Sequence, residues 1–159
     1  MALAQSDQKN YRQAIVSSTE ALEIDKKYYG EDHPLVGLRY SSLSANYREI
    51  GEFQKSETAI TKGIEIFKAN FGEKHDRLVS LFITKGLLYM ETNRLPEALE
   101  TWNESLSIRE KAIPAGHPAI AHLYHLRGRT HAMASEWEDA VNDFRVAGAT
   151  YLNLSLIHI

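Results

Sequence analysis

The chain has 159 residues, enough for one domain with a sizeable core. Its net charge of −3 gives no reason to expect a nucleic-acid or anionic-membrane partner. The absence of cysteine excludes disulfides, thiolate nucleophiles and cysteine-ligated zinc, and it favours a reducing, cytoplasmic location. No apolar run reaches the roughly 18 residues of a membrane span, and we expect neither a signal peptide nor a transit peptide.

The first predicted helix covers residues 11–29, where apolar and small side chains recur with helical spacing. Residues 1–8 resemble the tail of a helix whose start is missing, and we expect them to fray. Gly30 is placed to end the helix in a left-handed cap, and Pro34 suits the first turn of the next helix.

A second helix is predicted at about 35–50, and Gly51 is placed to end it. The same alternation of helix and turn then recurs, with Asn93 and Ser135 in the position of Gly51. The further helices are expected at about 53–71, 77–92, 95–113, 119–134 and 137–152.

The chain is internally repetitive, because His33, His75 and His117 lie 42 residues apart in similar turns. Each turn histidine precedes a helix start, so we interpret all three as structural. Whole columns of residues follow the same period, among them Tyr11, Phe53, Leu95 and Trp137; Ala14, Ser56, Ala98 and Ala140; Ala21, Gly63, Ser105 and Ala147; and Ser44, Gly86 and Gly128. Small residues within helices predict close approach between paired helices.

The period alone would also allow HEAT, armadillo or WD40 repeats. WD40 units need four strands, whereas these segments show helical spacing. HEAT repeats lack the observed order of a small residue in the middle of the first helix, an aromatic residue three positions later, and small residues in the second helix. This order is the tetratricopeptide signature, here with a longer second helix.

The pattern of residues 36–53 resembles the 42-residue tetratricopeptide repeats of the kinesin light chain type, through Val36, Tyr40, Leu43, Ser44, Tyr47, Gly51 and Phe53 and the later turn at 72–75. The resemblance implies an all-α fold, a right-handed superhelix of antiparallel helix pairs. It implies a single repeat domain over 1–153, with repeats at about 1–34 (partial), 35–76, 77–118 and 119–153 (partial). It also implies a protein-binding scaffold without catalytic residues or cofactors.

In this family the first helix of each pair lines a concave groove. The corresponding groove residues here are Leu38, Ser41, Ala45, Arg48, Ser80, Ile83, Leu87, Met90, His122, His125, Arg129 and Met133. This stripe is apolar in its middle and cationic towards its C-terminal end. We therefore expect a peptide or protein partner with apolar anchors followed by acidic residues.

The sequence departs from the family at the asparagine pairs that bind peptide backbone, because Ser41-Ser42, Ile83-Thr84 and His125-Leu126 occupy those positions. Lys85 and Arg127 also replace the leucine kept at Leu43. These departures do not justify carrying over the family's preference for acidic peptides that contain tryptophan.

Other functions remain open from sequence. The chain could be the regulatory or sensor arm of a larger signalling ATPase or protease whose catalytic part lies elsewhere. His122 and His125 have a spacing that can share a metal, but no carboxylate follows on their stripe, so we expect no metal. No nucleophile elbow or phosphate-binding loop is present in the sequence.

The C-terminal residues 154–159 break the repeat and resemble a translated sequencing adapter. We expect this tail to be non-native and the chain to be a fragment interrupted in its fourth repeat. A solenoid cut at both ends exposes apolar surface, so we also expect self-association through these ends.

Overall fold

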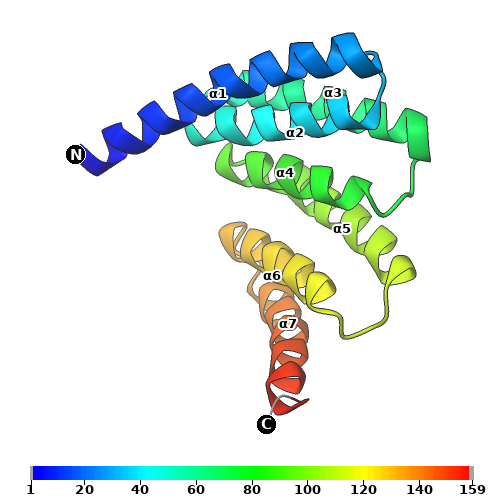
Figure 1. Ribbon diagram of the computed structural model, residues 1–159. Helices are drawn as coiled ribbons and strands as arrows, with labels where there is room; N and C mark the ends of the chain where they lie inside the picture. The colour runs from blue at the N-terminus through cyan, green and yellow to red at the C-terminus, as the bar shows by residue number, and fades with distance from the viewer. Residues whose placement is uncertain (1, 158–159) are drawn as a thin grey trace. The chain divides into compact units, whose positions relative to one another are not determined.

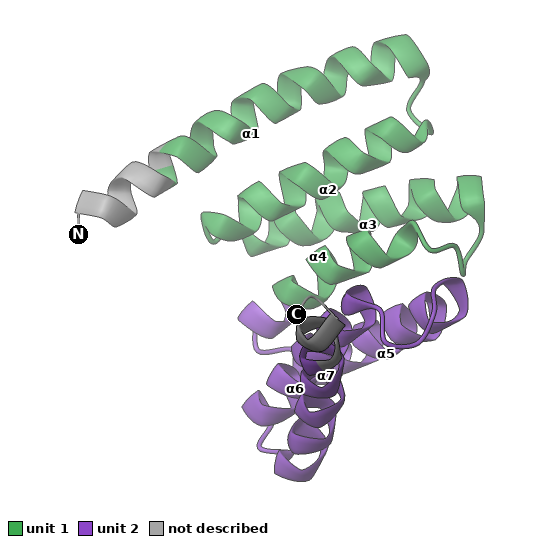
Figure 2. Cartoon of the chain, turned by 60° about the horizontal axis from the view of Figure 1, so that its bottom comes forward, with its two compact units in different colours: residues 1–88 green, residues 89–159 purple. Residues whose placement is uncertain are grey.

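The computed structural model describes the backbone of residues 2–157 and the side chains of residues 8 and 10–152. In this part of the chain the fold is all-α, with seven helices joined by short turns (Figure 1). The chain forms two compact units, residues 1–88 and 89–159, and the boundary lies within helix α4 (Figure 2). The expectation of one domain over 1–153 concerns how the two units join and stays a prediction.

Unit 1 contains α1 (Ala2–Tyr29), α2 (Pro34–Glu49), α3 (Phe53–Phe71) and most of α4 (Leu78–Glu91). Successive helices run antiparallel and side by side, as Figure 1 shows for α1, α2 and α3. Apolar side chains at helical spacing meet between them in one core cluster, formed by Leu22, Val36, Leu43, Ala59 and Ile66. This core fixes which face of α2 points inward.

Unit 2 contains α5 (Leu95–Ala112), α6 (Pro118–Met133) and α7 (Trp137–Ile157). The fully buried Trp102 joins α5 to α6, because its Nε1 donates a hydrogen bond of 2.9 Å to Thr130 Oγ1. The buried apolar side chains on the same helix as Thr130 are Ile120, Ala121, Leu123 and Leu126. Within the described residues, no helix is long and apolar enough to cross a membrane.

The expected close approach between paired helices is confirmed. A Cβ atom added to Gly63 would lie 2.8 Å from the backbone oxygen of Gly37, and one added to Gly128 would lie 3.0 Å from the Phe144 ring. Between α2 and α3, the buried hydroxyls of Ser44 and Ser56 lie 2.9 Å apart. Small residues are therefore required at these crossings by contact with the partner helix.

The predicted turns are also confirmed. Gly51, Asn93 and Ser135 end their helices with positive φ angles of 78°, 57° and 62°. Two helix bounds were wrong: α1 is one continuous helix from Ala2, and α7 continues to Ile157 instead of ending near 152. The side chains of residues 1–7 and of the 154–159 tail lie outside the described residues, so their expected fraying and origin stay predictions.

Candidate functional site

The predicted groove residues of α2 lie on its side away from the core. Leu38 is 44% exposed, a high value for a leucine in the middle of a helix, and Ser41, Ala45 and Arg48 are half-buried. The Arg48 guanidinium pairs with Glu49 at 2.6 Å. This face of α2 is therefore accessible and mostly uncharged.

The predicted residues of α4 lie on the adjacent face. Ser80 is exposed, whereas Ile83 and Leu87 are half-buried. Ser41 Oγ lies 3.5 Å from Thr84 Oγ1, which brings the exposed side of α2 next to that of α4. Met90 is only 4% exposed, so we leave it out of the accessible surface.

A recess of about 480 Å³ opens where α2 and α4 begin. Leu35, Leu38 and Phe67 provide apolar walls, and Ser80 lies at the edge. Arg77 also lines the recess, with its guanidinium carbon 5.1 Å from the centre of the Phe71 ring. The recess can thus accept an apolar side chain beside an anionic group.

In unit 2, the predicted residues of α6 are exposed: His122, His125, Arg129 and Met133. The His125 ring lies 5.6 Å from the Phe144 ring of α7, centre to centre. The face of α6 is thus more polar and more cationic than the faces of α2 and α4, as the sequence indicates.

The turn histidines are structural, as we interpreted them. His33, His75 and His117 each accept a hydrogen bond at Nδ1 from the backbone N–H two residues later, at 3.2, 3.1 and 3.1 Å. His33 and His117 are the N-cap residues of α2 and α6. His33 and His117 therefore act as N-caps, because each imidazole satisfies an amide in the first turn of its helix, and His75 makes the same hydrogen bond in the turn before α4.

A group of possible metal ligands among the described residues includes neither His122 nor His125. It consists of His131, Glu136 and Asp139, whose ligand atoms lie within 4.8 Å of one another. His131 Nδ1 already lies 2.6 Å from Glu136 Oε2, and both carboxylates are exposed. A hydrogen bond of this kind accounts for the group without an ion.

Sequence reasoning missed a polar bridge in unit 2. Arg127 of α6 donates to both carboxylate oxygens of Asp143 on α7, at 2.8 and 2.7 Å, and to Asn103 Oδ1 on α5 at 2.6 Å. These bonds to Asp143 raise the pKa of the Arg127 guanidinium. Burial, helped by the hydrogen bond to Glu110, raises the pKa of the neighbouring Tyr124 hydroxyl. The signal available in the sequence was that Arg127 occupies the repeat position held by Leu43 in the earlier repeat.

The comparisons with known proteins agree with this fold. Kinesin light chain-related protein 2 of Arabidopsis thaliana is 27% identical over 154 residues, which cover 96% of this chain and 22% of that protein. The secreted RxLR effector protein RXLR-C07 of Plasmopara halstedii is 26% identical, with coverage of 91% and 44%. The chain therefore spans less than half the length of these relatives.

A solved structure, BtubC (BKLC) from P. vanneervenii, superposes with a TM-score of 0.84 at 17% identity, covering 92% of this chain and 59% of that one. The sequence profile of the tetratricopeptide repeat matches residues 1–69 and 70–153. Such repeats generally mediate protein–protein interactions, and the family is typically non-enzymatic. The chain belongs to the tetratricopeptide-repeat family, and its repeats are similar to those of kinesin light chain-related proteins.

Proposed function

We propose that this chain is a protein-binding scaffold that takes a peptide segment on the exposed faces of α2 and α4 in unit 1, and that the exposed face of α6 in unit 2 is a separate binding surface of the same kind. The observation that carries the proposal is the recess at the start of α2 and α4. The recess is lined by the exposed Leu38 together with Ser80 and Arg77, and this lining supports the proposal. An accessible apolar recess with a nearby cation is typical of a peptide anchor site.

The charge distribution supports an acidic partner. Glu49 and Glu91 are the only acidic residues of α2, α4 and α6, and both stand at helix C-termini. The basic residues of the same helices are Arg39, Arg48, Lys85, Arg127 and Arg129. Arg39 pairs with Asp25 of α1 and Arg127 with Asp143 of α7, so the groove residues among them are Arg48 and Arg129. Because the whole chain has a net charge of −3, the first helices are positive against a negative remainder. Such a pattern favours ligands with apolar anchors followed by aspartate or glutamate.

A peptide array probed with the full chain tests this proposal. Leu38→Glu should abolish binding of the selected peptides, because it places a carboxylate in the recess. Val16→Glu is the matched control, since Val16 is 57% exposed on α1 and lies outside the recess. Loss of binding with Val16→Glu, or full binding with Leu38→Glu, would contradict the assignment.

A second pair of variants tests the preference for acidic ligands. Arg129→Glu on the exposed face of α6 should weaken acidic peptides and reduce the salt dependence of binding. Arg145→Glu makes the same charge change on α7, where the side chain is also exposed, and should have little effect. Equal effects of the two changes would indicate a response to net charge alone.

The cytoplasmic location and the absence of catalysis belong to the same proposal. The absence of cysteine and the typical role of the family support them. Cell fractionation of the tagged chain tests the location, and recovery in an extracellular or membrane fraction would contradict it.

A further inference from the structure

The turn between α2 and α3 brings three side chains together, one from the end of α2 and two from the start of α3. These residues are Tyr47, Glu52 and Lys55. Lys55 Nζ lies 3.3 Å from Glu52 Oε2 and 5.8 Å from the centre of the Tyr47 ring. The aromatic ring is thus covered by a cation that is itself paired with a carboxylate. We call these three positions, and their equivalents 42 and 84 residues later, the turn cluster.

The turn between α4 and α5 has the same kind of turn cluster with the charges exchanged. It contains Tyr89, Arg94 and Glu97. Arg94 Nε donates to Glu97 Oε1 at 2.9 Å, and the guanidinium carbon lies 4.2 Å from the centre of the Tyr89 ring. The hydrogen bond from Arg94 lowers the pKa of Glu97. In both of these turns, therefore, a tyrosine accompanies one cation and one anion.

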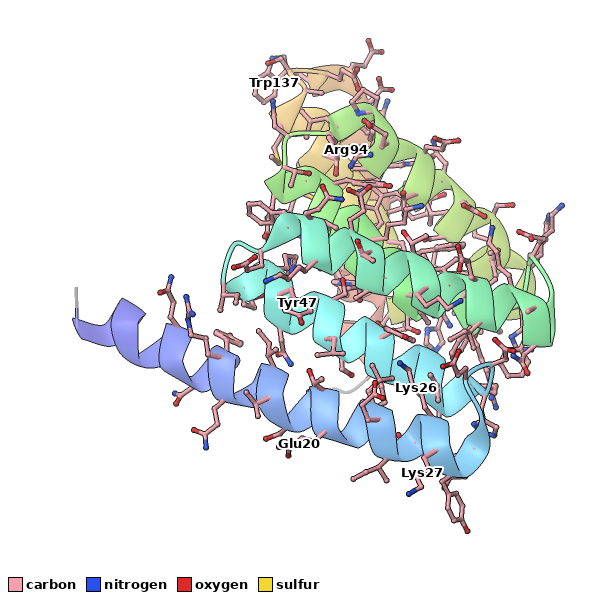
Figure 3. All side chains as sticks on the ribbon, turned by 90° about the horizontal axis from the view of Figure 1, so that it is seen from above. Glu20, Lys26, Lys27, Tyr47, Arg94 and Trp137 are labelled. Carbon is pink, nitrogen blue, oxygen red and sulfur yellow. The ribbon has the colours of Figure 1, made fainter. Side chains whose placement is uncertain are left out.

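The turn between α6 and α7 departs from this composition. Its turn cluster is His131, Glu136 and Asp139, so both charged positions are acidic and a histidine stands in the place of the tyrosine. Figure 3 labels one residue at each of the three turns, and at this one it labels Trp137, which follows Glu136. The ligand atoms of the three residues lie within 4.8 Å of one another. Two carboxylates thus stand where each earlier turn has a neutral ion pair.

The neighbouring residues do not supply the missing cation. His131 Nδ1 lies 2.6 Å from Glu136 Oε2, and this hydrogen bond accounts for the geometry but does not neutralise two carboxylates. The guanidinium of Arg127 is engaged with Asp143 and Asn103, so it does not balance the turn cluster. A bound cation would restore the charge balance of the two earlier turns.

The His131 ring is oriented in the way that metal-binding histidines are. Its Nε2 lies 3.9 Å from Oδ2 of the buried Asp143, so the imidazole has a carboxylate on each side. A metal-binding imidazole usually turns its other nitrogen towards a carboxylate, which keeps the proton on that nitrogen and directs the free lone pair at the metal. Asp143 can hold Nε2 in this way while Nδ1 faces Glu136.

The position at the start of α7 does not by itself explain the turn cluster. A helix N-terminus favours acidic side chains through its dipole, yet the equivalent start of α5 pairs Glu97 with a cation. The dipole also gives no reason for a histidine on the preceding helix. Accessibility of the turn is a property of the repeat, because Glu52 and Lys55 are exposed although further helices follow them.

We infer that His131, Glu136 and Asp139 bind a divalent transition-metal ion such as Zn²⁺, which joins the end of α6 to the start of α7. One imidazole nitrogen and two carboxylate oxygens are a ligand set that Zn²⁺ accepts, with water in the fourth position, whereas Mg²⁺ and Ca²⁺ prefer oxygen ligands alone. The ligands of one tetrahedral Zn²⁺ ion lie about 3–4 Å apart, so the two exposed carboxylates need only small rotations. The ion takes the place of the proton between Nδ1 and Glu136, and Nε2 carries a proton beside Asp143.

The two earlier turns provide the variants that test this site. His131→Tyr restores the residue found at Tyr47 and Tyr89 and removes the nitrogen ligand. Glu136→Arg copies Arg94 and supplies a cation of the chain's own, which can pair with Asp139. Each variant should weaken Zn²⁺ binding at least about tenfold. Because Glu136 is exposed, Glu136→Arg keeps the test valid if His131→Tyr proves unstable.

The control removes the competing histidines of the same helix. His122 and His125 are exposed and three residues apart, a spacing that can also share a metal. The double variant His122→Ala and His125→Ala should therefore keep the Zn²⁺ affinity of wild type if the ion binds at the turn cluster. Loss of binding in this double variant would place the ion on the face of α6 instead.

Isothermal titration calorimetry of the full chain with Zn²⁺ at neutral pH gives the affinity and the stoichiometry. Wild type and the double variant should each bind one ion at the same affinity, and Mg²⁺ should bind at least about tenfold more weakly than Zn²⁺. Thermal unfolding adds a second readout, since Zn²⁺ should raise the melting temperature of these two proteins but not that of His131→Tyr or Glu136→Arg. The inference is overturned if wild type binds no Zn²⁺, if Mg²⁺ binds equally well, or if both turn-cluster variants keep the wild-type affinity.

Discussion

At the residue scale, the turn histidines His33 and His117 act as helix caps. A proline follows His33 and His117 in the first helical turn, where its missing N–H costs no hydrogen bond. The imidazole Nδ1 then accepts from the next free amide. The repeated spacing of these turns within the chain is therefore explained by backbone hydrogen bonding and requires no ligand.

The cap predicts a measurable loss of stability. His117→Ala should lower the free energy of unfolding by about 1 kcal/mol, since it leaves the Ala119 amide without its acceptor. His117→Asn supplies another good N-cap and should restore most of that loss. Urea unfolding of the three proteins checks the prediction, and equal losses for Ala and Asn would contradict the capping role.

The bridge from Arg127 predicts a larger effect. Asp143 is only 5% exposed, and Asp143→Ala would leave a half-buried guanidinium without its carboxylate. We expect a loss of about 1–3 kcal/mol, because an unpaired polar group keeps its desolvation cost. Asn103→Ala removes one exposed hydrogen bond and should cost less than Asp143→Ala. Thermal unfolding that ranks the two variants in the opposite order would show that Arg127 depends on α5 instead of α7.

At the element scale, helix pairing depends on how closely the backbones approach. Gly63 and Gly128 lie where an added Cβ would meet a backbone oxygen or an aromatic ring, whereas nothing lies within 4 Å of a Cβ at Gly148. All three glycines are inside helices, so intrinsic helix propensity alone would favour alanine at each position. The neighbouring atoms therefore decide whether alanine stabilises or destabilises the chain at each position.

These glycines provide a prediction with an internal control. Gly63→Ala and Gly128→Ala should each destabilise the chain by about 1–3 kcal/mol, through overpacking at a helix crossing. Gly148→Ala should instead stabilise it by up to about 1 kcal/mol. Denaturant midpoints measure all three. Destabilisation by Gly148→Ala, or tolerance of alanine at Gly63, would mean that the crossings lie elsewhere.

Sequence reasoning was most successful for features that depend on neighbours along the chain. It predicted the turns at Gly51, Asn93 and Ser135 and the bounds of most helices within one residue, because caps and helical spacing are local. It was wrong at α1, because it assigned residues 1–8 to the tail of a preceding helix and started a new helix at residue 11, whereas one helix runs from Ala2 to Tyr29. The 42-residue period, together with the turn residues and the helical spacing, was enough to predict the all-α fold.

The candidate surfaces were harder to predict, because they depend on which side chains meet between helices. The sequence showed that Arg127 replaces the leucine at position 43, but only the fold brings Asp143 and Asn103 to it. The same holds for the recess, where Arg77 from the turn before α4 lies beside Leu38 of α2. Met90 has the helical position of a groove residue and is nevertheless buried.

At the scale of the whole molecule, the central claim is that a protein partner binds the exposed faces of the first helices. The most direct measurement is the change in backbone amide chemical shifts of the full chain when a peptide selected on the array is added. The largest changes should fall at Leu38 and Ser41 on α2 and at Ser80 and Ile83 on α4. Changes confined to α3 and α5, with those four residues unaffected, would contradict the claim.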